Sequence, residues 1–79
     1  MYNELLTVIK LIEKYDNEKS KLNIDISFYK SLNKSDYNAT RQELIIHKER
    51  ELEHINEFIQ ALYKQKKTLE KELILYVKY

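Results

Sequence analysis

The second half of the chain carries a seven-residue repeat of apolar positions, which predicts one long helix. Of ten repeat positions between residues 45 and 76, eight are apolar or aromatic. One set is Ile45, Leu52, Ile59, Lys66 and Leu73, and the other is Lys48, Ile55, Leu62, Leu69 and Tyr76. A repeat that keeps its register over this length is typical of a helix that packs against other helices. We therefore expect a helix over about residues 40–78.

The first half carries a weaker version of the same pattern. Its apolar seam is formed by Leu5, Val8, Ile12 and Tyr15 and continues in register as Lys19, Leu22, Ile26 and Tyr29. Asn3 is a suitable N-cap in front of it, and Leu6 and Leu11 lie beside the seam. The first turns are thus apolar over a wide arc, and the pattern predicts a helix over about residues 3–32.

Residues 23–28 are the least helical part of this half. Asn, Asp, Ser and Ile each cost roughly half a kcal/mol in a helix relative to Ala. Ile24, Ile26 and Phe28 also alternate, which fits a strand as well as Leu22, Ile26 and Tyr29 fit a helix. We favour a helix, because the register from Leu5 is unbroken and a lone strand has no partner. A break near residues 23–28 is the alternative.

A polar stretch over about residues 33–39 predicts the connection between the helices. Asn33 can adopt the left-handed conformation that ends a helix in the absence of Gly. Thr40 to Glu43 reads as a capping box at the start of the second helix, with Ser35 and Asp36 as alternative starts. A short connection makes two long helices antiparallel neighbours. The predicted fold class is therefore all-α: an antiparallel helical hairpin, coiled-coil-like, forming one domain over residues 1–79.

Three lysines interrupt the two seams, and each is level with an acidic residue of the other helix in such a hairpin. The expected pairs are Lys19 with Glu53, Lys48 with Asp25 and Lys66 with Glu4. In the alternative reading, the lysine stems cover the seam and the ammonium groups stay in water.

Apolar residues beyond the seams predict a second copy as partner, since two helices of this size bury only a small core. Residues 40–60 hold five Glu against three basic residues, whereas residues 61–79 hold five Lys against two Glu. If the second helices of two copies cross antiparallel near Ile59–Leu62, Glu53 of one copy lies beside Lys67 of the other. Glu49 then lies beside Lys71 of the other copy. We therefore expect a homodimer, arranged as a four-helix bundle. Its predicted interface residues are Leu44, Ile46, Phe58, Ile59, Leu62, Leu73, Ile74, Leu75, Tyr76 and Val77.

Composition removes several classes of function. The chain has no Gly, Pro or Cys, which excludes glycine-rich phosphate loops and thiol nucleophiles. The net charge is +1, and 12 Lys stand against 2 Arg, so bulk electrostatics does not favour nucleic acid. No run approaches the roughly 20 apolar residues of a membrane span, and we expect a cytoplasmic protein. Lys, Ile, Asn and Tyr are all abundant and have AT-rich codons, which suggests an AT-rich genome, such as that of a low-GC bacterium or of its phages and other mobile elements.

Candidate chemistry is sparse. Glu51 and His54 have the Glu-x-x-His spacing of helix-bundle metal sites, but Leu52 and Ile55 occupy the seam that metal ligands need. None of the serines has a His or Lys arranged to act as its base, and the chain has no glycine-built oxyanion loop. We expect no metal, no cofactor and no enzymatic activity.

The pattern as a whole favours a protein–protein interaction module that docks helix on helix, as a stoichiometric regulator, inhibitor or adaptor. One alternative is a nucleic-acid-associated accessory protein that uses Lys64, Lys67, Lys71 and Lys78. Another is a structural coiled-coil assembly factor.

Overall fold

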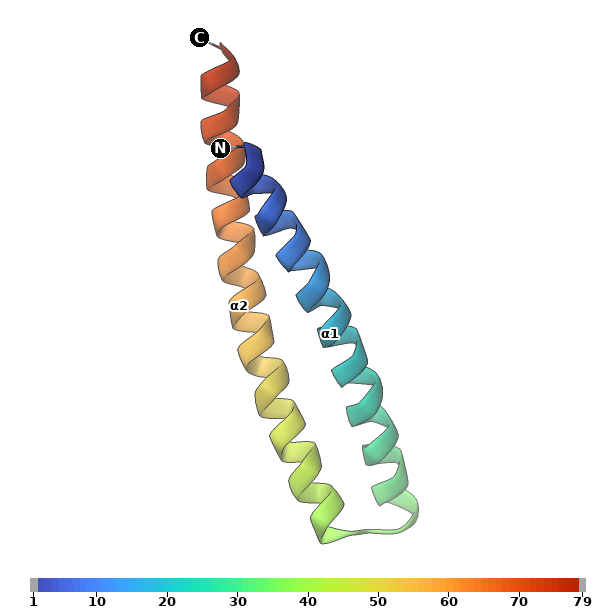
Figure 1. The fold of residues 1–79 in the computed structure, drawn as a ribbon. Helices are drawn as coiled ribbons and strands as arrows, with labels where there is room; N and C mark the ends of the chain where they lie inside the picture. The colour runs from blue at the N-terminus through green and yellow to red at the C-terminus, as the bar shows by residue number, and fades with distance from the viewer. Residues whose placement is uncertain (1, 79) are drawn as a thin grey trace.

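The chain folds into two long antiparallel helices. A computed structural model describes the backbone of residues 2–78 and the side chains of residues 2–75. Helix α1 spans Tyr2–Ser35 and helix α2 spans Ala39–Lys78. They lie side by side and are joined at one end by residues 36–38, forming a rod of 64 × 14 × 14 Å (Figure 1). The prediction of an all-α antiparallel helical hairpin is confirmed.

Helix α1 continues without a break through residues 23–28 and ends at Ser35, three residues beyond the predicted end. Leu22 and Ile26 are buried against α2 in this region. Tertiary packing of an apolar face contributes more to a helix than intrinsic propensity does, which explains why mediocre helix formers stay helical here. The alternation of Ile24, Ile26 and Phe28 does not produce a strand.

The core follows both predicted seams. Every seam residue whose side chain is described is buried or half-buried. Ile45 is the most deeply buried, with only 1% of its surface exposed. Near the chain termini the buried core cluster consists of Leu5, Val8, Ile12, Leu62 and Leu69. Nearer the connection the buried residues are Leu22, Ile26, Ile45 and Ile59.

Asn33 closes the turn through its side chain. Its Oδ1 accepts hydrogen bonds from the Arg41 Nη1 at 2.9 Å and from the Asn38 backbone N–H at 3.3 Å. Its Nδ2 donates to the Gln42 Oε1 at 3.2 Å. The prediction of a left-handed cap at Asn33 is wrong, because α1 runs past this residue and no described residue has a positive φ. Side-chain hydrogen bonds thus replace the glycine turn that the sequence lacks.

Helix α2 is capped by Asn38. The Asn38 Oδ1 accepts a hydrogen bond from the Arg41 backbone N–H at 2.9 Å, and its carbonyl accepts one from the Gln42 N–H at 3.0 Å. Thr40 lies inside the first helical turn, so the predicted capping box from Thr40 to Glu43 is wrong. Asn and Thr are both good N-caps, and Asn38 allows α2 to begin at Ala39.

One of the three predicted ion pairs forms. The Lys48 Nζ lies 3.5 Å from the Asp25 Oδ2. The pairs of Lys19 with Glu53 and of Lys66 with Glu4 are absent among the described residues. Glu53 follows the seam residue Leu52 and is turned away from α1, whereas Lys66 pairs with Glu70 at 3.2 Å, one turn along its own helix. A further pair joins Lys30 to Glu49 at 3.4 Å.

Candidate protein-interaction surface

The predicted interface residues near the connection are exposed. Leu44 and Ile46 flank the fully buried Ile45, and 42% of the Ile46 surface is accessible. Successive residues of a helix point about 100° apart, so when Ile45 faces α1 its two neighbours face outward. These side chains are free to contact another molecule.

The predicted interface residues at the other end of α2 behave in two ways. Leu73 is half-buried and packs against the core cluster, whereas Ile74 and Leu75 are exposed. With 40 residues against 34, α2 extends beyond the N-terminus of α1 (Figure 1). Helix α1 therefore leaves the last turns of α2 uncovered. The side chains of Tyr76 and Val77 lie outside the described residues.

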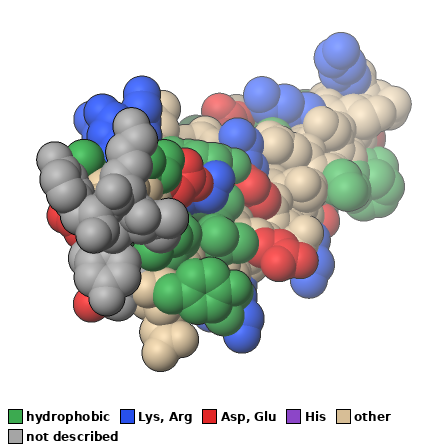
Figure 2. All heavy atoms as spheres, turned by 90° about the horizontal axis from the view of Figure 1, so that it is seen from above, with side chains coloured by type: hydrophobic (Ala, Val, Ile, Leu, Met, Phe, Trp, Pro, Cys, Tyr) green, Lys and Arg blue, Asp and Glu red, His purple; other side chains and the backbone are tan. Residues whose placement is uncertain are grey.

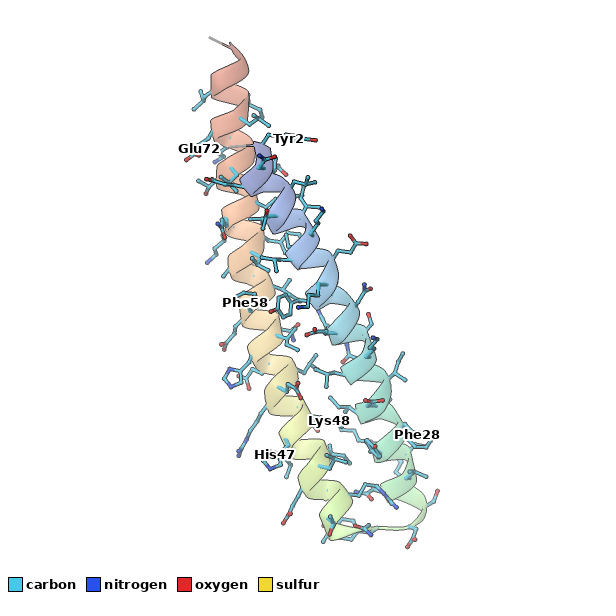
Figure 3. The ribbon with its side chains drawn as sticks, in the orientation of Figure 1. Tyr2, Phe28, His47, Lys48, Phe58 and Glu72 are labelled. Atoms are coloured by element: carbon cyan, nitrogen blue, oxygen red, sulfur yellow. The ribbon has the colours of Figure 1, made fainter. Side chains whose placement is uncertain are left out.

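Three central residues of the predicted interface contribute to the hairpin itself. Ile59 and Leu62 are buried between the helices. Phe58 reaches from α2 toward α1 and meets Tyr15 edge-on, with ring centroids 5.0 Å apart (Figure 3). Because 46% of its surface remains exposed, Phe58 can also touch a partner. Within one chain, Ile59 and Leu62 are already covered.

Helix α1 adds exposed apolar residues that we did not assign to the interface. Tyr2, Leu6 and Ile9 are exposed at the end that carries the termini. Figure 2 looks onto this end and shows hydrophobic side chains beside charged ones. The wide apolar arc of the first turns was the signal in the sequence that could have identified them.

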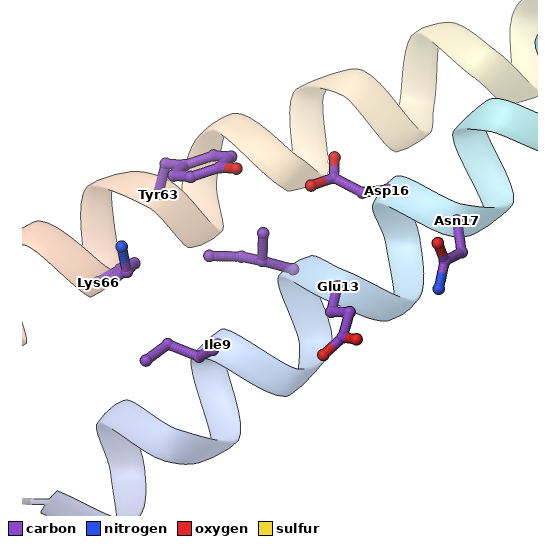
Figure 4. Close-up of a pocket in the computed structure, with 7 residues that line it drawn as sticks. Ile9, Glu13, Asp16, Asn17, Tyr63 and Lys66 are labelled. Carbon is purple, nitrogen blue, oxygen red and sulfur yellow. The ribbon is translucent and has the colours of Figure 1, made fainter.

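A shallow groove of about 280 Å³, which we call the Tyr63 groove, lies on one side of the hairpin. Tyr63 and Lys66 of α2 form one wall, and Ile9, Glu13 and Asp16 of α1 form the other (Figure 4). The groove is open to solvent, so its two carboxylates lack the dry, enclosed setting that acid–base catalysis requires. It is better suited to an apolar side chain of a partner.

A second open groove of about 520 Å³, the Phe58 groove, is lined by Tyr15, Glu18, Glu51, His54, Ile55 and Phe58. It contains the Glu-x-x-His pair, and two of its lining residues are aromatic. Metal binding needs three or more convergent ligands, and no such group of His, Asp or Glu occurs among the residues that the structure describes.

The structure describes the side chains of three of the four lysines that could contact nucleic acid. Lys64, Lys67 and Lys71 are exposed along α2, and none of them forms an ion pair within the described part of the chain. The Lys78 side chain lies outside that part.

The charge segregation along α2 is partly balanced within the hairpin by opposite charges on α1. Residues 2–18 hold four acidic and two basic residues, and the core cluster places this stretch against the lysine-rich half of α2. Residues 19–35 hold four Lys and one Asp and lie beside the Glu-rich half. The net segregation alone therefore does not require a second copy.

Within the described residues, no helix has an apolar stretch long enough to cross a membrane. No protein-family model, curated protein or solved structure gives a significant match to this chain.

Proposed function

We propose that this protein is a non-enzymatic interaction module that docks helix on helix, with a second copy of itself and with a target protein. One observation carries the proposal: apolar side chains are exposed at both ends of α2, outside the hairpin core. They are Leu44 and Ile46 at one end and Ile74 and Leu75 at the other. Clusters of exposed apolar residues on a small domain mark interaction surfaces more often than isolated ones do.

The helical scaffold suits this role. An amphipathic helix that is already folded loses little conformational entropy when it docks, and its apolar residues can fill the groove between two helices of a partner. The charged residues beside Ile46 and Ile74 then select the register and reject wrong partners. This mode of action fits a stoichiometric regulator, inhibitor or adaptor in a four-helix assembly.

Affinity capture with the full immobilised chain, from cells that express it, tests the target-binding part of the proposal. We expect Ile74→Asp and Leu75→Asp to lose partners that the wild-type chain retains, because a carboxylate at an apolar contact must be desolvated. Ile24→Asp is the matched control, since Ile24 is 68% exposed on α1 and lies off the seam. Equal capture by all four chains would show that the end of α2 is not a binding surface.

A second candidate is contact with nucleic-acid phosphates through Lys64, Lys67, Lys71 and Lys78. It is favoured by the three exposed lysines that have no acidic partner among the described residues. Fluorescence anisotropy with a labelled DNA duplex at about 50 mM salt should then show binding that weakens as salt is raised. Lys64→Glu combined with Lys71→Glu should abolish it, and no binding by the wild-type chain would remove this candidate.

A further inference from the structure

Five exposed residues of α2 recur every seven positions along the helix. They are Ile46, Glu53, Gln60, Lys67 and Ile74, and we call them the outer stripe. Each follows a seam residue by one position, so each lies about 100° around the helix from the seam. Since the seam keeps its seven-residue repeat along α1, residues spaced by seven keep one angle to α1. The outer stripe is therefore continuous and faces away from the core.

The outer stripe is complementary to an antiparallel copy of itself: apolar residues meet apolar ones, and acidic residues meet basic ones. In an antiparallel pair centred on Gln60, Ile46 meets Ile74 of the second copy and Glu53 meets Lys67 of the second copy. Gln60 meets Gln60, and an amide side chain can both donate to and accept from its own copy. A two-fold interface demands this kind of self-complementarity, because each residue's contact is repeated by symmetry.

The charges of the stripe are available for such a contact. Neither Glu53 nor Lys67 forms an ion pair with another described residue, and the expected pair of Glu53 with Lys19 does not form. In contrast, Glu49 and Glu70 on the neighbouring flank are paired with Lys30 and Lys66. Among the residues whose side chains are described, Glu53 and Lys67 of the outer stripe thus have no partner of opposite charge.

The same residues favour an antiparallel over a parallel arrangement of the two α2 helices. Parallel pairing of two outer stripes would place Glu53 against Glu53 and Lys67 against Lys67, which repel. In the antiparallel register Glu57 also lies beside Lys64 of the second copy, which adds an attractive pair on one flank. Arg50 lies near Lys71 of the second copy, and this repulsive pair stands against the attractive pairs of Glu53 with Lys67 and of Glu57 with Lys64.

We infer that a second copy of this chain docks antiparallel on the outer stripe, with the two-fold axis at Gln60. Ile46 and Ile74, which are 42% and 57% exposed, are the apolar anchors at the two ends of the contact. This inference rests on the self-association that we propose above and specifies its register. It places the two α2 helices at the centre of the assembly and the two α1 helices outside.

Charge reversal tests the register, with sedimentation velocity as the readout. Glu53→Lys and Lys67→Glu each turn two attractive contacts of the dimer into repulsive ones, and each should raise the dimer Kd about tenfold or more. The double variant Glu53→Lys/Lys67→Glu restores complementarity and should return the Kd to within about threefold of the wild-type value. Lys10→Glu, on the exposed side of α1, is the control and should leave the Kd unchanged. Far-UV circular dichroism of each variant checks that the hairpin stays folded.

Cysteine cross-linking tests the orientation without background, because the chain has no Cys. Gln60→Cys should form a disulfide-linked dimer under mild oxidation, and Glu53→Cys alone should not. A mixture of Glu53→Cys with Lys67→Cys should give the mixed dimer. Lys10→Cys serves as the control for random collisions.

The outcomes separate two failures. A wild-type chain that stays monomeric at several hundred micromolar would overturn both the outer-stripe contact and the proposed self-association. A wild-type dimer that is unaffected by either charge reversal, or in which Gln60→Cys does not cross-link, would overturn the register alone. Self-linking of Glu53→Cys would show that the helices pair in parallel.

Discussion

Phe58 of α2 and Tyr15 of α1 meet edge-on across the hairpin, with ring planes inclined at 72° and centroids 5.0 Å apart. This geometry places the positive edge of one ring against the negative face of the other. Phe58 therefore stabilises the hairpin in addition to any contact with a partner. For this reason Phe58→Ala cannot report on partner binding alone, and substitutions at Ile74 and Leu75 are the cleaner probes.

The aromatic pair should show measurable coupling. In a double-mutant cycle of Tyr15→Leu and Phe58→Leu, we expect a coupling free energy of about 0.5–1.5 kcal/mol. Urea unfolding followed by circular dichroism measures it, at a concentration where sedimentation shows a single species. Additive effects of the two substitutions would mean that the rings do not interact in solution.

The start of α2 should depend on Asn38 and not on Thr40. We expect Asn38→Ala to lower the free energy of unfolding by about 1 kcal/mol, because the Arg41 N–H loses its acceptor. Asn38→Asp keeps that acceptor and should retain most of the stability. Thr40→Ala is the matched control and should change the stability by less than about 0.5 kcal/mol. If Thr40→Ala proves the more damaging, the helix begins at the capping box after all.

Two adjacent isoleucines should respond in opposite ways. Ile45 is 1% exposed, so Ile45→Ala should cost about 2–5 kcal/mol, enough to unfold much of so small a domain. Ile46→Ala should change the stability of the monomer by less than about 0.5 kcal/mol while weakening self-association. Thermal unfolding and sedimentation velocity separate the two effects. Similar losses of monomer stability at both positions would contradict the burial pattern.

Lys48 lies on the seam, and replacing it should stabilise the hairpin. Its side chain is 22% exposed and pairs with Asp25, but an ion pair of this exposure contributes at most about 1 kcal/mol. Lys48→Leu exchanges the pair for apolar burial, and we expect the free energy of unfolding to rise by about 1 kcal/mol. Asp25→Asn isolates the loss of charge and should cost about 0.5 kcal/mol, less at high salt. A lower urea midpoint for Lys48→Leu would show that the ion pair outweighs the packing.

Periodicity predicted the helices and their shared seam well, because the position of the apolar face of a helix depends only on residue spacing along the chain. Ile45, Ile59, Leu62 and Leu69 are buried as their heptad positions require. The connection was predicted less well. Asn33, Asn38 and Thr40 all have suitable side chains for a cap, and the choice among them depends on where Arg41 and Gln42 meet α1. The contacts of Arg41 and Gln42 with α1 depend on how the two helices pack, and a short stretch of sequence does not contain that information.

For the candidate interaction surface, too, the sequence determined one part and the tertiary structure another. The order of residues alone determines the outer stripe, since Ile46, Glu53, Gln60, Lys67 and Ile74 are seven apart in any helix that keeps this register. Only the tertiary structure decided which of the many apolar and charged residues remain exposed for contact with another molecule. Ile59 and Leu62 are buried between the helices, and Phe58 packs against Tyr15. The expected ion pair of Glu53 with Lys19 does not form. The physical reason is that exposure and pairing depend on what the other helix covers, whereas helical periodicity depends only on spacing along one chain.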